Sequence, residues 1–194
     1  MKKIADNPFW LRVAPILLFA LLGGTPAQAA KPFDLDGFKD IKLGSSTSEM
    51  AAKGFKCVDD YHSCQLKDGV ENKRTLFGQP TRIGANYTDN VIDDIDVTID
   101  ITDDEMIKQF TSALGEPMTH DYVSFAGYKI RQFIWVSTDK ASIVVTKNLD
   151  KSHEKNIFGQ IVPINFSSAN YLSTKKTSDL LEEVKKGKLD KSDF

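Results

Sequence analysis

The chain contains very little histidine or tryptophan for its 194 residues: three histidines and two tryptophans. The histidines lie in separate segments and form no HExxH or similar ligand pair, so a histidine-based metal site has no support. The G-x-S-x-G elbow of serine hydrolases and the P-loop of nucleotide-binding proteins are also absent. We therefore expect no enzyme and no cofactor. A hydrolase with a site assembled from distant residues stays open as an alternative, because such groups need be adjacent only in space.

An excess of positive charge is absent too. The chain has 25 Lys and Arg against 27 Asp and Glu, a net charge of −2. Residues 1–29 carry three of the basic and one of the acidic side chains, so the remainder has a net charge of about −4. Binding to a polyanion requires a basic patch. We therefore expect no nucleic-acid partner.

Long apolar runs are absent except near the N-terminus. There the basic residues Lys2, Lys3 and Arg12 precede an apolar run that ends at Leu22, and Ala27-Gln28-Ala29 follows as a small-x-small sequence. This is the pattern of a secretory signal peptide. The run is too short for a membrane span, which needs about 20 apolar residues. We expect a bacterial signal peptide in residues 1–29, removed near Ala29, and a soluble periplasmic or secreted protein.

Cysteine is limited to one pair, Cys57 and Cys64, in the stretch CVDDYHSC. In an oxidising compartment two cysteines allow one intramolecular pairing, and we expect a structural disulfide. The Cys-x6-Cys spacing with His62 nearby falls outside the usual zinc spacings, and the Cys-x-x-Cys of redox sites is absent. Reactive or intermolecular thiols and a metal site are the alternatives.

Helix signals recur along the chain. Ser46 with Glu49, and Thr102 with Glu105, each form a capping box, and a glycine follows each segment. The first box predicts a short helix over residues 47–53. The second opens a longer helix, TDDEMIKQFTSALGEP, whose apolar residues recur at helical spacing. The stretch TSDLLEEVKKG predicts a third helix, with acids in its first turn and lysines in its last, and the charged tail after it is expected to fray.

Between the helices the apolar period changes to two. The alternation in residues 81–101 predicts an antiparallel hairpin with one solvent-exposed face. Three further strands are predicted in HDYVSFAGYKIRQFIWVSTDKASIVVTKN. IVPINFSS adds a possible last strand. We expect an α+β domain over residues 30–175, a two-layer sandwich with its helices on one face of an antiparallel sheet, followed by a C-terminal helix and charged tail in residues 176–194. The two capped helices, each followed by strands, suggest a weak internal repeat.

Acidic residues form a row in VIDDIDVTIDI, where Asp94, Asp96 and Asp100 fall on the face opposite the apolar residues. Such a row can present a negative surface to a basic partner or hold calcium, although the glycine turn and following glutamate of a calcium loop are absent. A solvated face paired with nearby cations is the alternative without a function. The three aspartates are candidate partner-binding residues.

Aromatic residues cluster later in the chain. Phe133 and Trp135 share a predicted strand face with Arg131. If exposed, this set resembles an interface patch, because Trp, Tyr and Arg dominate binding hot spots. If buried, it is an ordinary core between sheet and helix. All three residues are candidates for partner binding.

The stretch FKDIKLGSSTSEMAAKGFKC, a strand, a glycine, a capped helix and a second strand, resembles a bacterial envelope module. Similar modules occur in the beta-lactamase inhibitory protein and in small outer-membrane assembly lipoproteins. The matching positions are Ile41, Leu43, Gly44, Ser46, Glu49 and Gly54. The resemblance covers residues 33–147 and implies a protein-binding module that acts through its sheet face or loops, without a cofactor. A lipoprotein cysteine near the cleavage point is absent.

These observations predict an exported, non-catalytic protein that binds another envelope or extracellular protein, as an inhibitor, an immunity factor or an assembly accessory. A periplasmic protein that binds a small ligand or calcium through its acidic row is the alternative of a different class, besides the hydrolase.

Overall fold

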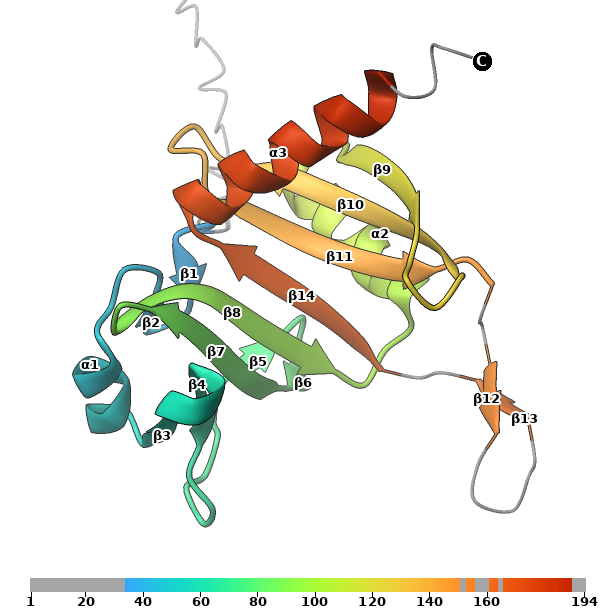
Figure 1. Ribbon diagram of the computed structural model, residues 1–194. Helices are drawn as coiled ribbons and strands as arrows, with labels where there is room; N and C mark the ends of the chain where they lie inside the picture. Colours follow the sequence, from blue (N-terminus) through green and yellow to red (C-terminus); the bar gives the residue numbers. More distant parts are fainter. Residues whose placement is uncertain (1–33, 151–152, 156–160, 164–165, 190–194) are drawn as a thin grey trace, which may run out of the picture. The chain divides into compact units, whose positions relative to one another are not determined.

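The computed structural model describes residues 34–150, 153–155, 161–163 and 166–189, all within one compact unit. Eight strands form one antiparallel sheet in the spatial order β3-β4-β7-β8-β14-β11-β10-β9 (Figure 1). The strands of the sheet are β3 (Phe55–Val58), β4 (Ser63–Leu66), β7 (Arg82–Thr88), β8 (Val91–Ile99), β9 (Met118–Val123), β10 (Lys129–Val136), β11 (Ser142–Asn148) and β14 (Ser167–Leu172).

Within the described residues, three two-stranded ladders and four helical segments accompany the sheet. The ladders pair β1 (Gly37–Phe38) with β2 (Ile41–Lys42), β5 (Thr75–Leu76) with β6 (Gln79–Pro80), and β12 (His153–Lys155) with β13 (Ile161–Pro163). The helical segments are α1 (Thr47–Ala52), the 3-10 turn η1 (Asp59–Tyr61), α2 (Asp103–Leu114) and α3 (Thr174–Leu189). The predicted signal peptide and the end of the charged tail lie outside the described residues.

The predicted N-cap residues start the first two helices, with the complete capping box at Ser46 and the forward bond of the box at Thr102. The Ser46 hydroxyl accepts the backbone N–H of Glu49 at 3.2 Å, and the Glu49 carboxylate accepts the backbone N–H of Ser46 at 2.6 Å. Thr102 caps α2 by accepting the N–H of Glu105 at 3.3 Å. Each helix therefore begins where a side chain satisfies an otherwise unpaired backbone donor.

The sheet is built from two similar halves. In each half a helix precedes four strands: α1 precedes β3, β4, β7 and β8, and α2 precedes β9, β10, β11 and β14. Each half follows its own sequence order from the sheet edge to the centre, where β8 pairs with β14. This arrangement agrees with the predicted repeat at the level of topology.

One face of the sheet, here called the core face, carries the main core. Ile95 and Val97 of β8 are fully buried and belong to the same cluster as Met50 of α1 and Phe110 of α2. The β1–β2 ladder and the segment around β5 contribute to this cluster as well. Both capped helices therefore lie over the core face.

The third helix lies on the opposite face, which corrects one prediction. Val184 of α3 packs with Ile134 of β10 and Val144 of β11 in a second, smaller cluster. Ile134 adjoins Trp135, which belongs to the main core, and neighbouring strand residues point to opposite faces. The α+β class with an antiparallel sheet is confirmed, but the grouping of all helices on one face is not. The cause is the run of buried residues Ser142–Val145, which needs cover on both faces.

The last predicted strand also differs. The stretch IVPINFSS divides between β13, which pairs only with β12 in the described part of the chain, and the start of β14 at Ser167. β14 continues to Leu172 and forms the centre of the sheet. The third helix begins at Thr174, three residues before the predicted stretch, so its first turn carries no acidic residue and the predicted match to the helix dipole is wrong there. The helix follows β14 closely and is part of the same folded unit.

Candidate functional site: the polar face of β4, β7, β8 and β14

The face opposite the core face is polar over one half of the sheet, and this part is here called the polar face. Its middle row follows from the strand register: Gln65 of β4 lies opposite Gly84 of β7, Gly84 opposite Asp96 of β8, and Asp96 opposite Asn170 of β14. The adjacent rows carry Ser63, Asn86 and Asp94 on one side and Arg82, Thr98 and Ser168 on the other.

Part of the sheet on this side is covered and part is not. The helix α3 packs on β10 and β11, and in Figure 1 it lies well away from β4 and β7. A shallow hollow of about 660 Å³ occupies this uncovered part. Its lining includes Gln65, Arg82, Gly84, Asn86 and Asp96. The polar face therefore combines open access with a recess of the size of a small ligand or a few side chains.

A β-bulge explains the interrupted alternation in the acidic row. Asn86 pairs with Asp94 but Tyr87 pairs with Ile92, so Asp93 is an extra residue without a partner in β7. A bulge inserts one residue into one strand of an antiparallel pair and bends that strand. The backbone carbonyl of Asp93 accepts the N–H of Ser173, 3.0 Å away, at the entry to α3. The bulge therefore lies where the chain leaves β14.

Lys176 of α3 neutralises part of the acidic row. Its Nζ lies 3.1 Å from Asp93 Oδ1 and 3.7 Å from Asp94 Oδ2. Asp94 also accepts a weak hydrogen bond of 3.3 Å from Asn86, while its Oδ1 is buried and has no hydrogen-bond partner among the described residues. Burial raises the pKa of Asp94, and the charge of Lys176 opposes that shift without cancelling it.

Asp96 differs from its neighbours in the row. Its carboxylate accepts a hydrogen bond of 2.9 Å from Thr98, whose hydroxyl lies 2.7 Å from that of Ser168. Among the described lysines and arginines none forms an ion pair with Asp96, whereas Arg82 pairs with Asp100 at 2.9 Å. Burial raises the pKa of Asp96, and the Thr98 hydrogen bond only partly opposes the shift. Asp96 is thus a half-buried carboxylate without a counter-ion in the described structure.

The three candidate partner-binding residues on β10, Arg131, Phe133 and Trp135, differ in how deeply they are buried. Trp135 is 4% exposed, and its indole N–H donates to the carbonyl of Gly115 at 2.8 Å. Phe133 is partly buried against the main core. Arg131 is partly exposed and donates two hydrogen bonds to the Asp121 carboxylate, at 2.7 Å each. Trp135 thus has a packing role, whereas Arg131 and Phe133 are both partly exposed to solvent.

Cys57 and Cys64 form the predicted disulfide. They lie directly opposite each other in the β3–β4 hairpin, with their Cα atoms 3.9 Å apart, and Cys64 is fully buried. Between them, Asp59 accepts a hydrogen bond of 2.7 Å from the Tyr87 hydroxyl, and the His62 ring packs edge-on to the Tyr87 ring. These contacts make the hairpin a structural element of the first half of the sheet.

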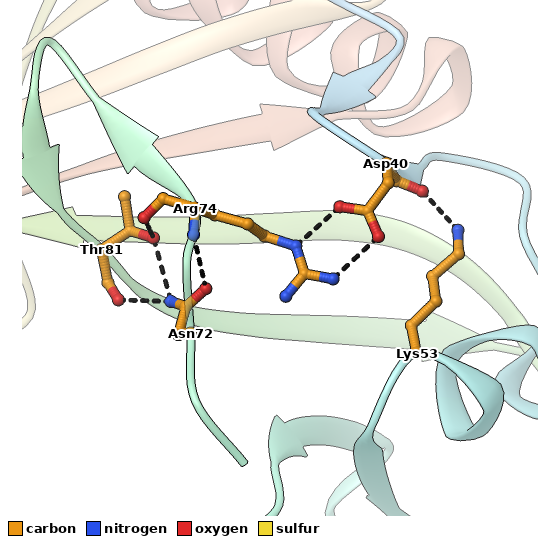
Figure 2. A network of polar contacts seen from close by, with 5 residues as sticks. All are labelled: Asp40, Lys53, Asn72, Arg74 and Thr81. Carbon is orange, nitrogen blue, oxygen red and sulfur yellow. Dashed lines mark hydrogen bonds and ion pairs between the residues drawn. The ribbon is translucent and has the colours of Figure 1, made fainter.

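A polar network that the sequence did not reveal fixes the segment before β7 (Figure 2). Arg74 donates two hydrogen bonds to the Asp40 carboxylate, at 2.6 and 2.8 Å, and these lower the pKa of Asp40. Lys53 donates to the Asp40 backbone carbonyl. Asn72 donates to the carbonyl of Thr81 at 2.6 Å, and the Thr81 hydroxyl donates to the carbonyl of Arg74 at 2.9 Å. The network positions the chain at the rim of the hollow.

Sequence reasoning found the acidic row but missed three of its neighbours, Lys176, Gly84 and Gln65. Lys176 reaches the row only because α3 folds back over the sheet. Gly84 had a readable signal, since a glycine takes a solvent-facing position inside the alternating stretch RIGANYT. In the described residues no cluster of three or more histidine, cysteine or carboxylate side chains could hold a metal ion.

No protein family, curated protein or solved structure that was compared with this chain matches it. Among the helices that the structure describes, none is long and apolar enough to cross a membrane.

Proposed function

We propose that this protein is exported and binds another protein of the cell envelope or the cell exterior through its polar face, without catalysing a reaction. Inhibition, immunity and assembly of an envelope complex are the roles that fit such binding. The observation that carries the proposal is the half of the sheet face over β4 and β7, which holds aligned polar side chains and a hollow. The resemblance of residues 33–147 to envelope modules that bind proteins adds to the proposal.

The size of the polar face supports a protein partner. The four strands of the polar face are four to nine residues long and together cover about 400 Å² of sheet. A standard interface buries about 800 Å² on each partner, so the partner would also contact the surrounding turns. Tyr61 is 77% exposed in the turn before β4, two residues from Ser63, which lines the hollow. An exposed tyrosine this close along the chain to a residue that lines the hollow is a suitable anchor for such a contact.

Export is part of the same proposal. The disulfide between Cys57 and Cys64 suits an oxidising compartment, because cytosolic thiols are kept reduced. The sequence pattern of residues 1–29 supplies the expected signal peptide. We propose the periplasm or the extracellular space as the location.

The test is affinity capture from native envelope extract with three forms of the oxidised protein: the unchanged chain, Asn86→Arg and Ser112→Arg. Asn86 lines the hollow, while Ser112 is exposed on α2, which covers the other face. Both variants add the same charge to an exposed site. A protein that the unchanged chain and Ser112→Arg retain, but Asn86→Arg loses, supports the proposal. Equal retention by both variants, or no specific protein at all, contradicts it.

A further inference from the structure

Gly84 has no structural reason to be a glycine. Its backbone does not adopt the left-handed conformation that favours glycine, and a Cβ atom built on it would meet no heavy atom within 4 Å. Glycine within a strand weakens the strand and often marks a place where a ligand or another backbone approaches closely. The β7–β8 bulge lies further along the strand, after Asn86, and does not involve Gly84. The bare backbone at Gly84 therefore forms an open floor within the hollow.

A negative charge without a counter-ion adjoins this floor. Asp96 lies directly opposite Gly84 in the β7–β8 ladder. Its neighbours in the row are already compensated, Asp94 by Lys176 and Asp100 by Arg82. A half-buried carboxylate costs free energy unless a cation or further hydrogen bonds accompany it. The hollow thus offers a charge to which a cation from outside is complementary.

The side-chain amide of Gln65 lies on the other side of Gly84 from Asp96. Gln65 of β4 lies opposite Gly84 on its other side, so Gln65 and Asp96 are separated by two strand spacings, about 10 Å. A planar guanidinium can lie flat over the bare peptide group between these two side chains. Its five N–H donors can bond the Asp96 carboxylate on one side and the Gln65 amide oxygen on the other, whereas a lysine ammonium is a compact point charge.

We propose that the floor at Gly84 and the carboxylate of Asp96 receive an arginine side chain of the partner protein. This inference rests on the proposed function and specifies the chemistry by which the polar face recognises its partner. Two-bond pairing of arginine with a carboxylate supplies both geometry and charge specificity. The arginine would pair with Asp96, so the ion pairs of Lys176 with Asp93 and Asp94 stay intact when it binds.

The test is a ¹⁵N NMR titration of the oxidised protein at low ionic strength with three blocked tripeptides. These are acetyl-Gly-Arg-Gly-amide, the same peptide with lysine, and the same peptide with citrulline, which has the shape of arginine without its charge. We expect the arginine peptide to shift the amide signals of Gln65, Gly84 and Asp96, and the citrulline peptide to leave them unchanged. Equal shifts with citrulline contradict charge recognition. Equal or larger shifts with lysine contradict the assignment to arginine.

Variants identify the residues. Asp96→Asn should weaken the affinity for the arginine peptide by about tenfold or more, which is the usual effect of losing a charged hydrogen-bond partner. Gly84→Leu keeps the carboxylate but fills the floor, and should also abolish the shifts. The matched control is Asp121→Asn, which removes the same charge from β9, at the far edge of the sheet. Retained binding by both Asp96→Asn and Gly84→Leu overturns the inference.

The outcomes separate this inference from the proposed function. If Asn86→Arg no longer binds the captured partner but Asp96→Asn still does, the polar face binds a protein and the proposed arginine site at Gly84 and Asp96 is wrong. If no captured protein depends on Asn86, the proposed function fails whatever the peptides show.

Discussion

Lys176 Nζ lies 3.1 Å from Oδ1 of Asp93, so an ion pair ties α3 to the bulge of β8. The second contact, 3.7 Å from Asp94, places one lysine between two half-buried carboxylates. The apolar contact of α3 is small, with Val184 its only fully buried apolar side chain among the described residues. The ion pair therefore helps to fix the position of α3, together with the buried hydrogen bond between the hydroxyls of Thr177 and Ser142, 2.8 Å apart.

Lys176→Gln should loosen α3. The substitution leaves two partly buried carboxylates without their cation, and we expect a loss of about 1–2 kcal/mol in the free energy of unfolding, between the values of exposed and buried pairs. Hydrogen exchange should accelerate in α3 more than in β7 or β8. Lys175→Gln is the matched control, because Lys175 forms only an exposed pair with Asp179. Equal effects of the two variants would show that Lys176 has no special role.

Asp96→Asn should stabilise the protein at neutral pH. Burial raises the pKa of Asp96, so the ionised carboxylate costs stability above that pKa, and the asparagine removes the cost. We expect the melting temperature at pH 7 to rise by up to about 3 °C. The advantage should shrink as the pH falls through the raised pKa, and vanish below about 3.8, where both folded and unfolded chains are protonated. A gain that stays constant down to pH 3 would contradict this origin.

A residue whose replacement stabilises the fold is characteristic of a binding site, where function is kept at the expense of stability. Asp96→Asn should therefore combine higher stability with loss of arginine binding.

Asp40→Asn should have the opposite pH dependence. The hydrogen bonds from Arg74 lower the pKa of Asp40, so the pair contributes stability above the unfolded pKa near 3.8 and loses it as the pH falls through the lower folded pKa. Because both groups are partly exposed, we expect a loss of no more than about 1 kcal/mol at pH 7. Urea unfolding at pH 7 and pH 3 measures it. Asp68→Asn, in an exposed turn, is the control, and an Asp40→Asn effect as large at pH 3 as at pH 7 would contradict the account.

Trp135→Ala and Arg131→Ala separate core from surface on the same strand. Trp135→Ala should lower the free energy of unfolding by about 3–5 kcal/mol, because removal of the buried side chain leaves a cavity and an unpaired carbonyl at Gly115. The exposed pair of Arg131 with Asp121 should be worth about 1 kcal/mol or less. Chemical denaturation followed by circular dichroism gives both values. A near-neutral Trp135→Ala would place that residue outside the core and restore it as a candidate for binding.

The sequence predicted local structure well where signals were local. The capping residues Ser46 and Thr102 marked helix starts, and the alternation in residues 81–101 marked the β7–β8 hairpin. Even the single break in that alternation had a physical meaning, because the extra residue Asp93 forms the bulge. Such features depend on neighbours in the chain, which a sequence pattern records.

Long-range placement could not be read in the same way. β14 lies at the centre of the sheet, yet its core-face residues are Ser167, Ala169 and Tyr171, two of which are small and give little apolar signal. Burial of the β10 aromatics depended on α2, which supplies Phe110 against Trp135 with ring centres 5.4 Å apart. The helix α3 covers the face of the sheet on which Val144 lies. The sequence shows that Val144 is apolar, but it does not show to which face its side chain points.

The most direct test of the central claim is site-specific photo-crosslinking in living cells. A photoreactive phenylalanine analogue is placed at Asn86 on the polar face in one strain, and at the exposed Ser112 of α2 in another. If the polar face binds a protein, position 86 should give a discrete adduct of higher mass after irradiation and position 112 should not. An adduct only from position 112, or none from position 86 while the protein is folded and exported, would contradict the account.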